Sequence, residues 1–576
     1  MKGKSFKEVG NYDVHPGFPY VCESRSGQAR GRQMEGVLAT GITRRDFLRY
    51  ATTAATAVGA LSLAGCGSQR ASEATTGSAT STSAAALFNY ALNESPQALD
   101  PALVNDFGSL ELCANIYEGL FRFKGETCDV EPCLAESYDV SDDGLTYTFK
   151  LREGVTFHDG TAFDASAVVT NFERQMNGNA AANMSYADFV FGSDATGVGV
   201  KSVEATDTYT VTCTMRSPCA PFLRNLAMAL GTPIVSPTAL AKANGDMSSA
   251  PCGTGPYQLD SWDKDSTVTL KAFDGYWDKD NAPQTETIVF RIIPESASRV
   301  TALSNSEVDI ITAVETNSAP TVQNDGDTVV AIDGLNVNYL CLNMTSTKLA
   351  DIAVRTAVCQ AIDIEEMVKA LYGDYADVAN SLMPPFMASY VTNVSYPSYD
   401  PDAARDAFSK AGVTDLVAMT YTTAMQYNPA GGQALAESIQ GYLSKCGVNL
   451  AINSYDWTTF RTKRKEEYFD LALFGWSGDN GDPDNFMNLF ATSGSVAAMA
   501  HFSDASYDAL VEQGIQTPDG SDRDDIYLQL EQRLASTLPC LPLSHTKSVC
   551  AYKPSIQNFT MNPSGWSKLA GVTKQA

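Results

Sequence analysis

Hydrophobic and polar residues alternate in two segments of the chain. Residues 146–151 (TYTFKL) alternate throughout, and residues 469–476 (FDLALFGW) alternate until they reach a loop rich in Gly and Asp. Successive side chains of a strand point to opposite faces, so both segments are predicted to be half-buried strands. Beyond the first strand, apolar residues recur at helical spacing behind Asp164, through Val168 and Phe172. This pattern predicts a helix with Asp164 as its N-cap.

Three further helices are predicted in the second half of the chain. Asp351 precedes apolar residues spaced as on one helix face, and Pro401 stands in the first turn of a helix that ends at Gly412. Another helical pattern runs from Ala430 to Lys445. Helices and strands are mixed throughout without a fixed period of repetition, which predicts α/β lobes rather than a solenoid, sandwich or bundle.

Composition limits the classes of protein and partner. The chain has 576 residues, 44% of them hydrophobic, which predicts a globular protein of about two to four domains. Asp and Glu number 67 against 40 Lys and Arg, for a formal charge of −27. Such a surface repels phosphate backbones, so no nucleic-acid partner is expected. The four histidines lack metal-ligand spacing, so no metal site is predicted.

The N-terminal segment has the features of an export signal. Residues 43–49 (TRRDFLR) precede a mildly apolar run over residues 50–65, and the paired Arg44 and Arg45 resemble a twin-arginine signal. The alternative is a short buried helix with arginines placed by chance, because the run is shorter than the ~20 residues of a spanning helix. Met34 is an alternative translation start to Met1.

A lipid attachment site follows the apolar run. Residues 63–66 (LAGC) resemble the lipobox at which lipoprotein signals are cleaved before a lipidated cysteine, here Cys66. Residues 66–86 after it are mostly Ser, Thr, Ala and Gly, which predicts a flexible tether. The export signal is therefore assigned to residues 1–65, and the folded body is expected to begin near Leu87 on the outer face of the cell membrane.

The cysteines leave two interpretations open. The chain has thirteen, of which Cys22 lies in the signal and Cys66 is the lipidation site, leaving eleven in the body. An exported chain permits disulfides, and three pairs are close enough in sequence to bridge local loops. They are Cys128 with Cys133, Cys213 with Cys219, and Cys540 with Cys550. The alternative is that these residues are small buried hydrophobes.

Five collinear blocks resemble the peptide/nickel-type solute-binding proteins of ABC importers. The blocks are residues 143–174, 251–257, 275–310, 354–367 and 469–486. The resemblance implies a two-lobed, periplasmic-binding-protein-like α/β fold with an additional inserted domain, whose lobes close on ligand by a hinge. It assigns residues 87–125, 251–334 and 542–576 to lobe I, residues 126–250 to the inserted domain, and residues 335–541 to lobe II.

The most specific block is residues 478–486 (GDNGDPDNF), which resembles the ligand loop of dipeptide and oligopeptide receptors. The resemblance implies that Asp479 pairs with the α-ammonium of a peptide and that Trp476 and Trp457 line its pocket. The alternatives are an aspartate that caps a turn and tryptophans of the core. Backbone contacts to the peptide are expected at Gly475 and Ser477, and in the lobe I loop at Asn105, Asp106, Phe107 and Gly108.

One departure from the dipeptide branch bears on ligand length. That branch has an arginine for the ligand carboxylate before a Tyr-Asn-Pro segment, whereas this chain has Met425-Gln426 before Tyr427. In the oligopeptide branch an arginine at the position of Arg464 can take the carboxylate of a longer peptide. The alternative for Arg464 is a place on a solvated basic helix face.

No catalytic residue or cofactor is predicted, because the chain lacks a G-x-S-x-G elbow, a phosphate loop and an H-E-x-x-H helix. The resemblance implies a monomeric, lipid-anchored substrate-binding protein that captures short peptides, longer than two residues, between its lobes. It would deliver them to an ABC permease and its ATPase subunits. Oligosaccharides, nickel chelates and haem are alternative ligands, because the same architecture serves them.

Overall fold

The computed structural model describes residues 87–177, 184–193 and 197–575. The predicted export signal with Arg44 and Arg45, the lipidation site Cys66 and the tether lie outside the described residues. Within the described ranges, no helix combines the length and apolar character needed to cross a membrane.

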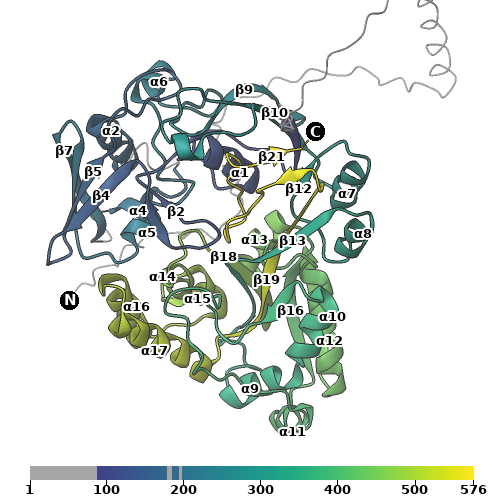
Figure 1. The fold of residues 1–576 in the computed structure, drawn as a ribbon. Coiled ribbons are helices and arrows are strands. Elements are labelled where there is room, and N and C mark those ends of the chain that lie inside the picture. Colours follow the sequence, from purple (N-terminus) through teal and green to yellow (C-terminus); the bar gives the residue numbers. More distant parts are fainter. Residues whose placement is uncertain (1–86, 178–183, 194–196, 576) are drawn as a thin grey trace, which may run out of the picture. The chain divides into compact units, whose positions relative to one another are not determined.

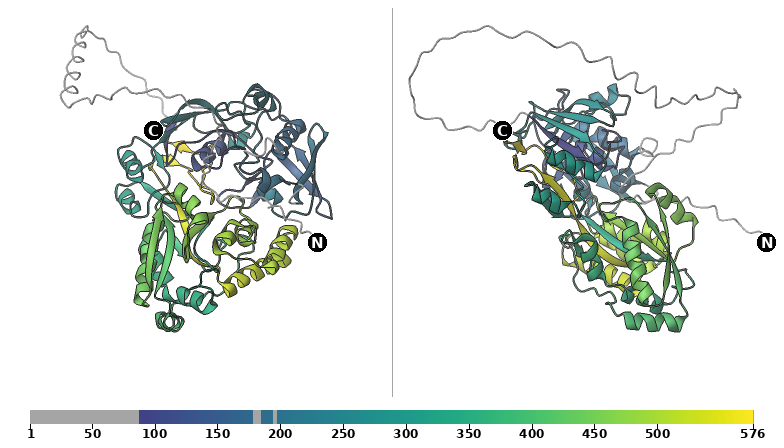
Figure 2. Two further views of the ribbon diagram at one scale, coloured as in Figure 1. Left: turned by 180° about the vertical axis from the view of Figure 1, so that it is seen from behind. Right: turned by 90° about the vertical axis from the view of Figure 1, so that its right-hand side faces the viewer.

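A twelve-stranded sheet runs through the body, in the order β17-β16-β18-β14-β19-β12-β1-β11-β10-β9, with β13 and β15 also paired to β19. Figure 1 shows it between the helices, and Figure 2 gives two further views. Its strands are β1 (Leu87–Leu92), β9 (Tyr257–Asp263), β10 (Thr267–Ala272), β11 (Thr287–Ile292), β12 (Ile310–Ile311), β13 (Thr328–Asp333), β14 (Asn336–Leu342), β15 (Ala376–Val378), β16 (Asp415–Tyr421), β17 (Asn449–Tyr455), β18 (Leu471–Ser477) and β19 (Cys540–Tyr552).

Strand β19 joins the two halves of this sheet. Its first residues pair with β14 and β15, whereas its last residues, from Lys547 onward, pair with β12 and β13. Only Gly334 and Leu335 separate β13 from β14. The chain therefore passes between the halves at two neighbouring places, residues 334–335 and the middle of β19.

A five-stranded antiparallel sheet is formed within residues 126–250. Its order is β4-β5-β8-β7-β6, built from β4 (Ala135–Val140), β5 (Thr146–Leu151), β6 (Gly192–Ser193), β7 (Val198–Asp207) and β8 (Thr210–Met215). Strand β5 has the predicted bounds. Helix α2 (Ala165–Met176) packs on β7 and β8, and its N-cap Asp164 accepts the backbone N–H groups of Ser166 and Ala167. The predicted strand and the predicted cap are both confirmed.

The helices predicted in the second half of the chain are present, one of them with a later start. Asp351 caps α9 (Ile352–Ala361), and α11 (Pro401–Ala411) ends at Gly412, whose φ of 69° is left-handed. Helix α12 (Gly432–Lys445) begins two residues after the predicted Ala430, because Gly431 has a φ of 81°, outside the helical region.

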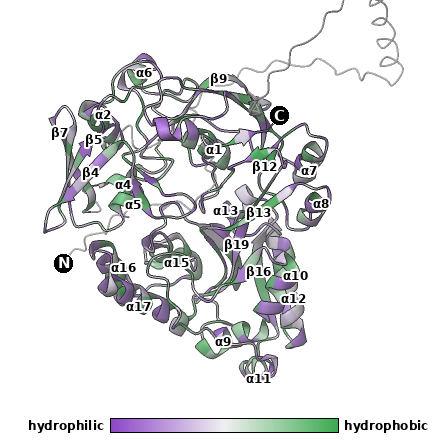
Figure 3. Cartoon of the chain, viewed as in Figure 1, coloured by the Kyte–Doolittle hydropathy of each residue, from purple (hydrophilic) through white to green (hydrophobic). Residues whose placement is uncertain are grey.

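The remaining elements surround the sheets, and in Figure 3 many helices show both purple and green turns, as amphipathic helices do. The helices are α1 (Phe107–Ile116), α4 (Ala187–Phe191), α5 (Phe222–Asn225), α6 (Pro237–Lys242), α7 (Ser296–Ser304), α8 (Ala319–Asn324), α10 (Ile364–Tyr372), α13 (Trp457–Glu466), α14 (Asp484–Met487), α15 (Ser495–Ala500), α16 (Ala505–Gln516) and α17 (Ser521–Thr537), with short 3-10 turns η2 (Lys279–Asn281) and η3 (Asn488–Phe490). Short strand pairs are β2 (Phe121–Phe123) with β3 (Val130–Pro132), and β20 (Ile556–Gln557) with β21 (Thr573–Lys574).

Strand β18 corrects one prediction, because it is buried along its whole length rather than half-buried. Leu471 and Leu473 pack into a core that includes residues of α9 and α12, whereas Phe474 and Trp476 pack into the larger core on the opposite face. Successive side chains of β18 therefore point into two different hydrophobic cores, rather than alternately into a core and into solvent. The strand leads directly into the predicted ligand loop, so the loop starts from a rigid element.

All eleven cysteines of the described residues have free thiols, and ten of them are buried. None of the three pairs named from the sequence forms a disulfide in the structure. The interpretation as small buried hydrophobes therefore describes these cysteines, and burial raises the pKa of several of their thiols, such as Cys128 to about 12.

Candidate functional site

The loop that follows β18 is held back against its own strand by one side chain. The Oδ1 atom of Asn485, in α14, accepts the indole N–H of Trp476 at 2.8 Å and the backbone N–H of Asp479 at 3.2 Å. Trp476 is thereby buried with its polar atom satisfied. These two hydrogen bonds fix the position of the Asp479 backbone relative to β18.

The carboxylate of Asp479 lies in partly desolvated surroundings. Its Oδ1 accepts a hydrogen bond from the hydroxyl of Tyr186 at 2.9 Å, and no cation of the described residues forms an ion pair with it. Burial raises the pKa of Asp479 to about 6, although the hydrogen bonds from Tyr186 and Asn485 act in the opposite direction. A desolvated carboxylate without an ion-pair partner is a site that a ligand cation can stabilise.

A cavity of about 30 Å³ opens at Asp479. Its lining comes from segments far apart in the chain: Asn105, Leu110, Tyr186, Met228, Ala229, Leu230, Gln426, Ser477, Gly478, Asp479, Ser564 and Trp566. This volume has room for about two water molecules, whereas sites for small-molecule ligands are typically ~300 Å³ or more. The structure is therefore closed around the Asp479 carboxylate, and the cavity must widen to admit a larger ligand.

A second, larger cavity touches the same loop at Gly481. It measures about 390 Å³ and is lined by Glu126, Thr127, Cys128, Asp129, Arg224, Ala331, Ile332, Asp333, Phe386, Met387, Ala388, Gly481 and Pro563. Ser564 lines the first cavity and Pro563 lines the second, so consecutive residues contribute to the two cavities. The loop therefore contributes Asp479 to the first cavity and Gly481 to the second.

Aromatic rings form a stack behind β18. Trp457 lies 5.5 Å from Phe460 and 5.9 Å from Phe474 between ring centroids, nearly parallel to both. Trp457 is only 7% exposed and does not line the cavity at Asp479. The guanidinium of Arg464 lies 5.6 Å from the ring centroid of Phe474, a cation–π contact. Arg464 thus lies against the stack and is partly buried, rather than on a fully solvated helix face.

The remaining predicted residues fall into two groups. Ser477 and Asn105 line the cavity together with Asp479. Asp106 instead caps α1, where its Oδ1 accepts the backbone N–H of Ser109 at 2.8 Å, and burial raises its pKa. A side chain added at Gly565 would touch both Phe107 and Gln426 beside the cavity.

Gly475 is required for close packing. A Cβ at this position would lie 2.2 Å from the ring of Tyr427, far inside van der Waals contact. The ring of Tyr427 thereby covers the backbone of β18 two residues before Ser477. This contact shapes the strand end and leaves no room for another residue type.

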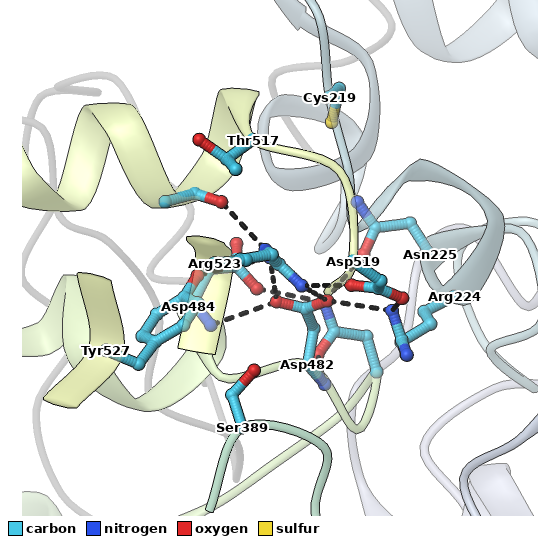
Figure 4. Close-up of polar contacts among 12 residues, drawn as sticks. Cys219, Arg224, Asn225, Ser389, Asp482, Asp484, Thr517, Asp519, Arg523 and Tyr527 are labelled. Atoms are coloured by element: carbon cyan, nitrogen blue, oxygen red, sulfur yellow. Dashed lines mark hydrogen bonds and ion pairs between the residues drawn. The ribbon is translucent and has the colours of Figure 1, made fainter. Parts of the chain in front are cut away.

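An ion-pair network behind the loop joins three parts of the chain (Figure 4). The carboxylate of Asp482 contacts Arg523 of α17 at 2.6 Å and 2.9 Å and Arg224 of α5 at 3.2 Å. Asp519 contacts Arg224 at 2.9 Å and Arg523 at 2.7 Å. Burial alone would raise the pKa of Asp482, but Arg523 and Arg224 lower it below its usual value. Asp482 is therefore ionised and structural.

Contacts from residues 126–250 reach the loop at three positions. Tyr186 donates to Asp479, Asn480 donates through Nδ2 to Asn225 Oδ1 at 2.7 Å, and Arg224 pairs with Asp482. These partners are separated in sequence by more than 250 residues. Sequence reasoning missed Tyr186, Asn225 and Arg224, because no local pattern marks a residue that acts across such a distance.

Comparison with known proteins identifies the class of protein to which this fold belongs. The model of the bacterial extracellular solute-binding proteins, family 5 Middle, matches residues 129–498, so the chain belongs to this family. The family and the fold predicted from the sequence are confirmed.

Three similar proteins illustrate the family. The chain is 32% identical over 505 residues to the dipeptide-binding protein of Escherichia coli K12, covering 83% of this chain and 92% of that protein. It is 29% identical over 550 residues to heme-binding protein A of Haemophilus influenzae, covering 91% and 99%. It matches the structure of the periplasmic binding protein DppA from Helicobacter pylori in complex with the peptide STSA at a TM-score of 0.72 and 28% identity, covering 86% and 99%. All three relatives are binding proteins.

Proposed function

We propose that this protein is the lipid-anchored substrate-binding protein of an ABC transporter and that it captures short peptides by their amino terminus. The observation that carries the proposal is the desolvated Asp479 carboxylate, which faces the cavity without an ion-pair partner among the described residues. Similarity to the dipeptide-binding protein of Escherichia coli supports the peptide class. Cys66 would carry the lipid, and an ABC permease with its ATPase subunits would receive the peptide from the monomeric receptor.

Peptide capture would proceed by closure about the two strand passages at residues 334–335 and the middle of β19. The peptide ammonium would pair with Asp479, and backbone bonds at Ser477 would supply affinity that does not depend on the side chains of the peptide. The ring of Tyr427 covers Gly475, so Gly475 would shape the end of the strand rather than contact the peptide. The hydroxyl of Ser477 is buried and has no hydrogen-bond partner among the described residues, so it is available to a ligand.

Calorimetry with four ligand classes tests the proposal. The purified protein is titrated with di- to pentapeptides, an oligosaccharide, a nickel–histidine chelate and haem. Binding of peptides alone is the expected result. Binding of any of the other three without a peptide would replace the peptide assignment by that ligand class.

Peptide affinity should fall in mild acid. Because the pKa of Asp479 is about 6, a proton competes with the ligand ammonium below that pH, whereas the ammonium itself stays charged. The dissociation constant should therefore rise about tenfold from pH 7 to pH 5. Calorimetry across this range measures the effect. An affinity that does not change between these pH values would exclude Asp479 as the partner of the ammonium.

Arg224 should slow the release of bound peptide. Its guanidinium connects residues 126–250, which contain Arg224, to Asp482 of the loop and to Asp519, so it stabilises the closed form. Arg224→Gln should accelerate dissociation about 3–10-fold, the scale of a partly exposed ion pair, while Arg224→Lys retains the charge and most of the effect. Stopped-flow dissociation measures the rates. Equal rates in the wild type and Arg224→Gln would contradict a role in closure.

A further inference from the structure

The cavity at Asp479 carries a single charge. Its other polar lining residues are neutral, and they include Asn105, Gln426, Ser477 and Ser564. The hydroxyl groups of Ser477 and Ser564 are buried and have no hydrogen-bond partner among the described residues. The lining therefore offers one carboxylate and several neutral hydrogen-bonding groups, and it contains no lysine, arginine or histidine among the described residues.

Three cations, Arg224, Arg523 and Lys547, are already engaged with carboxylates of the protein. Arg224 and Arg523 pair with Asp482 and Asp519 on the far side of the loop. Lys547, in the middle of β19, pairs with Asp333 at 2.9 Å and with Asp377 at 3.2 Å. Redirecting any of these side chains to a ligand would leave a carboxylate without its partner.

The free carboxylate of a dipeptide finds no cationic partner in this lining. Two residues of extended chain span about 7 Å, so the carboxylate of a dipeptide stays close to its ammonium. The cavity must widen to admit the second residue, and with the ammonium at Asp479 the carboxylate would then lie within about 7 Å of Asp479, against the neutral side chains of the lining and near a second negative charge. A neutral amide at the same place could donate to the unpartnered hydroxyl groups instead.

We propose that the cavity selects ammonium ligands whose other end is neutral, so that a C-terminally amidated dipeptide is a better ligand than the free acid. This inference rests on the proposed function, because it concerns the same site. The preference for the amide arises from the lining of the cavity. It should therefore decrease as the peptide lengthens and its carboxylate moves beyond the lining. Arg464 lies against Phe474 and outside this lining.

Calorimetry near neutral pH with Leu-Phe, its C-terminal amide and the N-acetylated amide tests the inference. The amide should bind at least about tenfold more tightly than the acid, and acetylation should abolish binding. An acid that binds as tightly as the amide, or more tightly, would overturn the inference and leave the proposed function standing. Absence of binding by every amine ligand would refute both.

A tetrapeptide pair separates the cavity from the charge of the whole protein. Because the formal charge is −27, general repulsion would favour an amide at any length. The acid and amide of Leu-Phe-Ala-Ala should bind within about threefold of each other if the cavity is responsible. A tenfold preference for the amide at this length would overturn the inference.

A substitution at Gln426 tests the lining directly. The Nε2 atom of Gln426 lies 3.2 Å from Ser548 Oγ, at the edge of the cavity. Gln426→Arg would add a cation there and should make Leu-Phe the tighter ligand, whereas the uncharged Gln426→Met should keep the preference for the amide. A thermal melt confirms that each variant is folded. A folded Gln426→Arg protein that still prefers the amide would contradict the inference.

Discussion

Asp479→Asn should weaken peptide binding by about 2–5 kcal/mol, the range for removing one partner of a buried charge pair. Asparagine keeps the size of the side chain and an oxygen that can accept the hydroxyl of Tyr186, so the change removes charge more than shape. Calorimetry measures the loss, and Asp482→Asn is not a suitable control because that carboxylate holds two arginines. A loss of less than tenfold in the dissociation constant would exclude Asp479 from the binding of the ammonium.

The same substitution should stabilise the ligand-free protein. The pKa of Asp479 is raised to about 6 in the folded state, so ionisation of this group opposes folding, and stability is lost as the pH rises from about 4 through 6. At pH 7 the asparagine variant should therefore gain about 1–3 kcal/mol in the free energy of unfolding, and near pH 4 it should gain almost nothing. Urea unfolding at both pH values measures this difference.

Arg523→Met should lower the free energy of unfolding by about 3–5 kcal/mol. Arg523 and Asp482 are both fully buried, with side-chain exposures of 0%, and methionine would leave the carboxylate with Arg224 as its main partner. The guanidinium also donates to the carbonyl of Gly514 at 2.8 Å. Urea unfolding measures the loss.

A double variant separates the charge pair from packing. Arg523→Met combined with Asp482→Asn removes both charges, so it should recover part of the stability that the single Arg523→Met variant loses. Additive losses in the two single variants would contradict a direct coupling between these residues. A loss below about 1 kcal/mol in Arg523→Met would show that the pair contributes little.

Two carboxylates of one loop affect the stability of the protein in opposite directions: ionised Asp479 destabilises the fold, whereas ionised Asp482 stabilises it. Asp482 is neutralised by two arginines of the chain itself, whereas Asp479, three residues earlier, has only a tyrosine hydroxyl and an amide. The chain thus stabilises the loop through one carboxylate and gives the other no ion-pair partner among the described residues. In the proposed function a ligand ammonium supplies that partner. Residues that bind a ligand often lower the stability of the ligand-free protein.

Local features of the fold could be predicted from the sequence. The alternation in residues 146–151 predicts β5, and Asp164 and Asp351 mark helix starts that the structure contains. These features depend on neighbouring residues, whose spacing the sequence displays directly. The late start of α12 and the complete burial of β18 were not predicted, because Gly431 adopts an unusual φ and two cores enclose the strand.

Three of the residues named from the sequence line the cavity, but their partners across the cavity were not predicted. Asp479, Ser477 and Asn105 line one cavity, although Asn105 stands more than 370 residues before the other two. Tyr186 and Arg224 were missed, because their contacts with the loop arise from tertiary packing of the segment that contains the five-stranded sheet. Asn485 lies within the loop motif 478–486. Its amide oxygen accepts hydrogen bonds from Trp476, in the strand before the loop, and from the backbone of Asp479.

The most direct test of the central claim is calorimetry with one peptide that binds and its N-acetylated form. If Asp479 captures the peptide ammonium, the free peptide binds and the acetylated form, which has no charge at that end, binds at least about a hundredfold more weakly. Equal affinity of the two forms would contradict recognition of the amino terminus and the role assigned to Asp479.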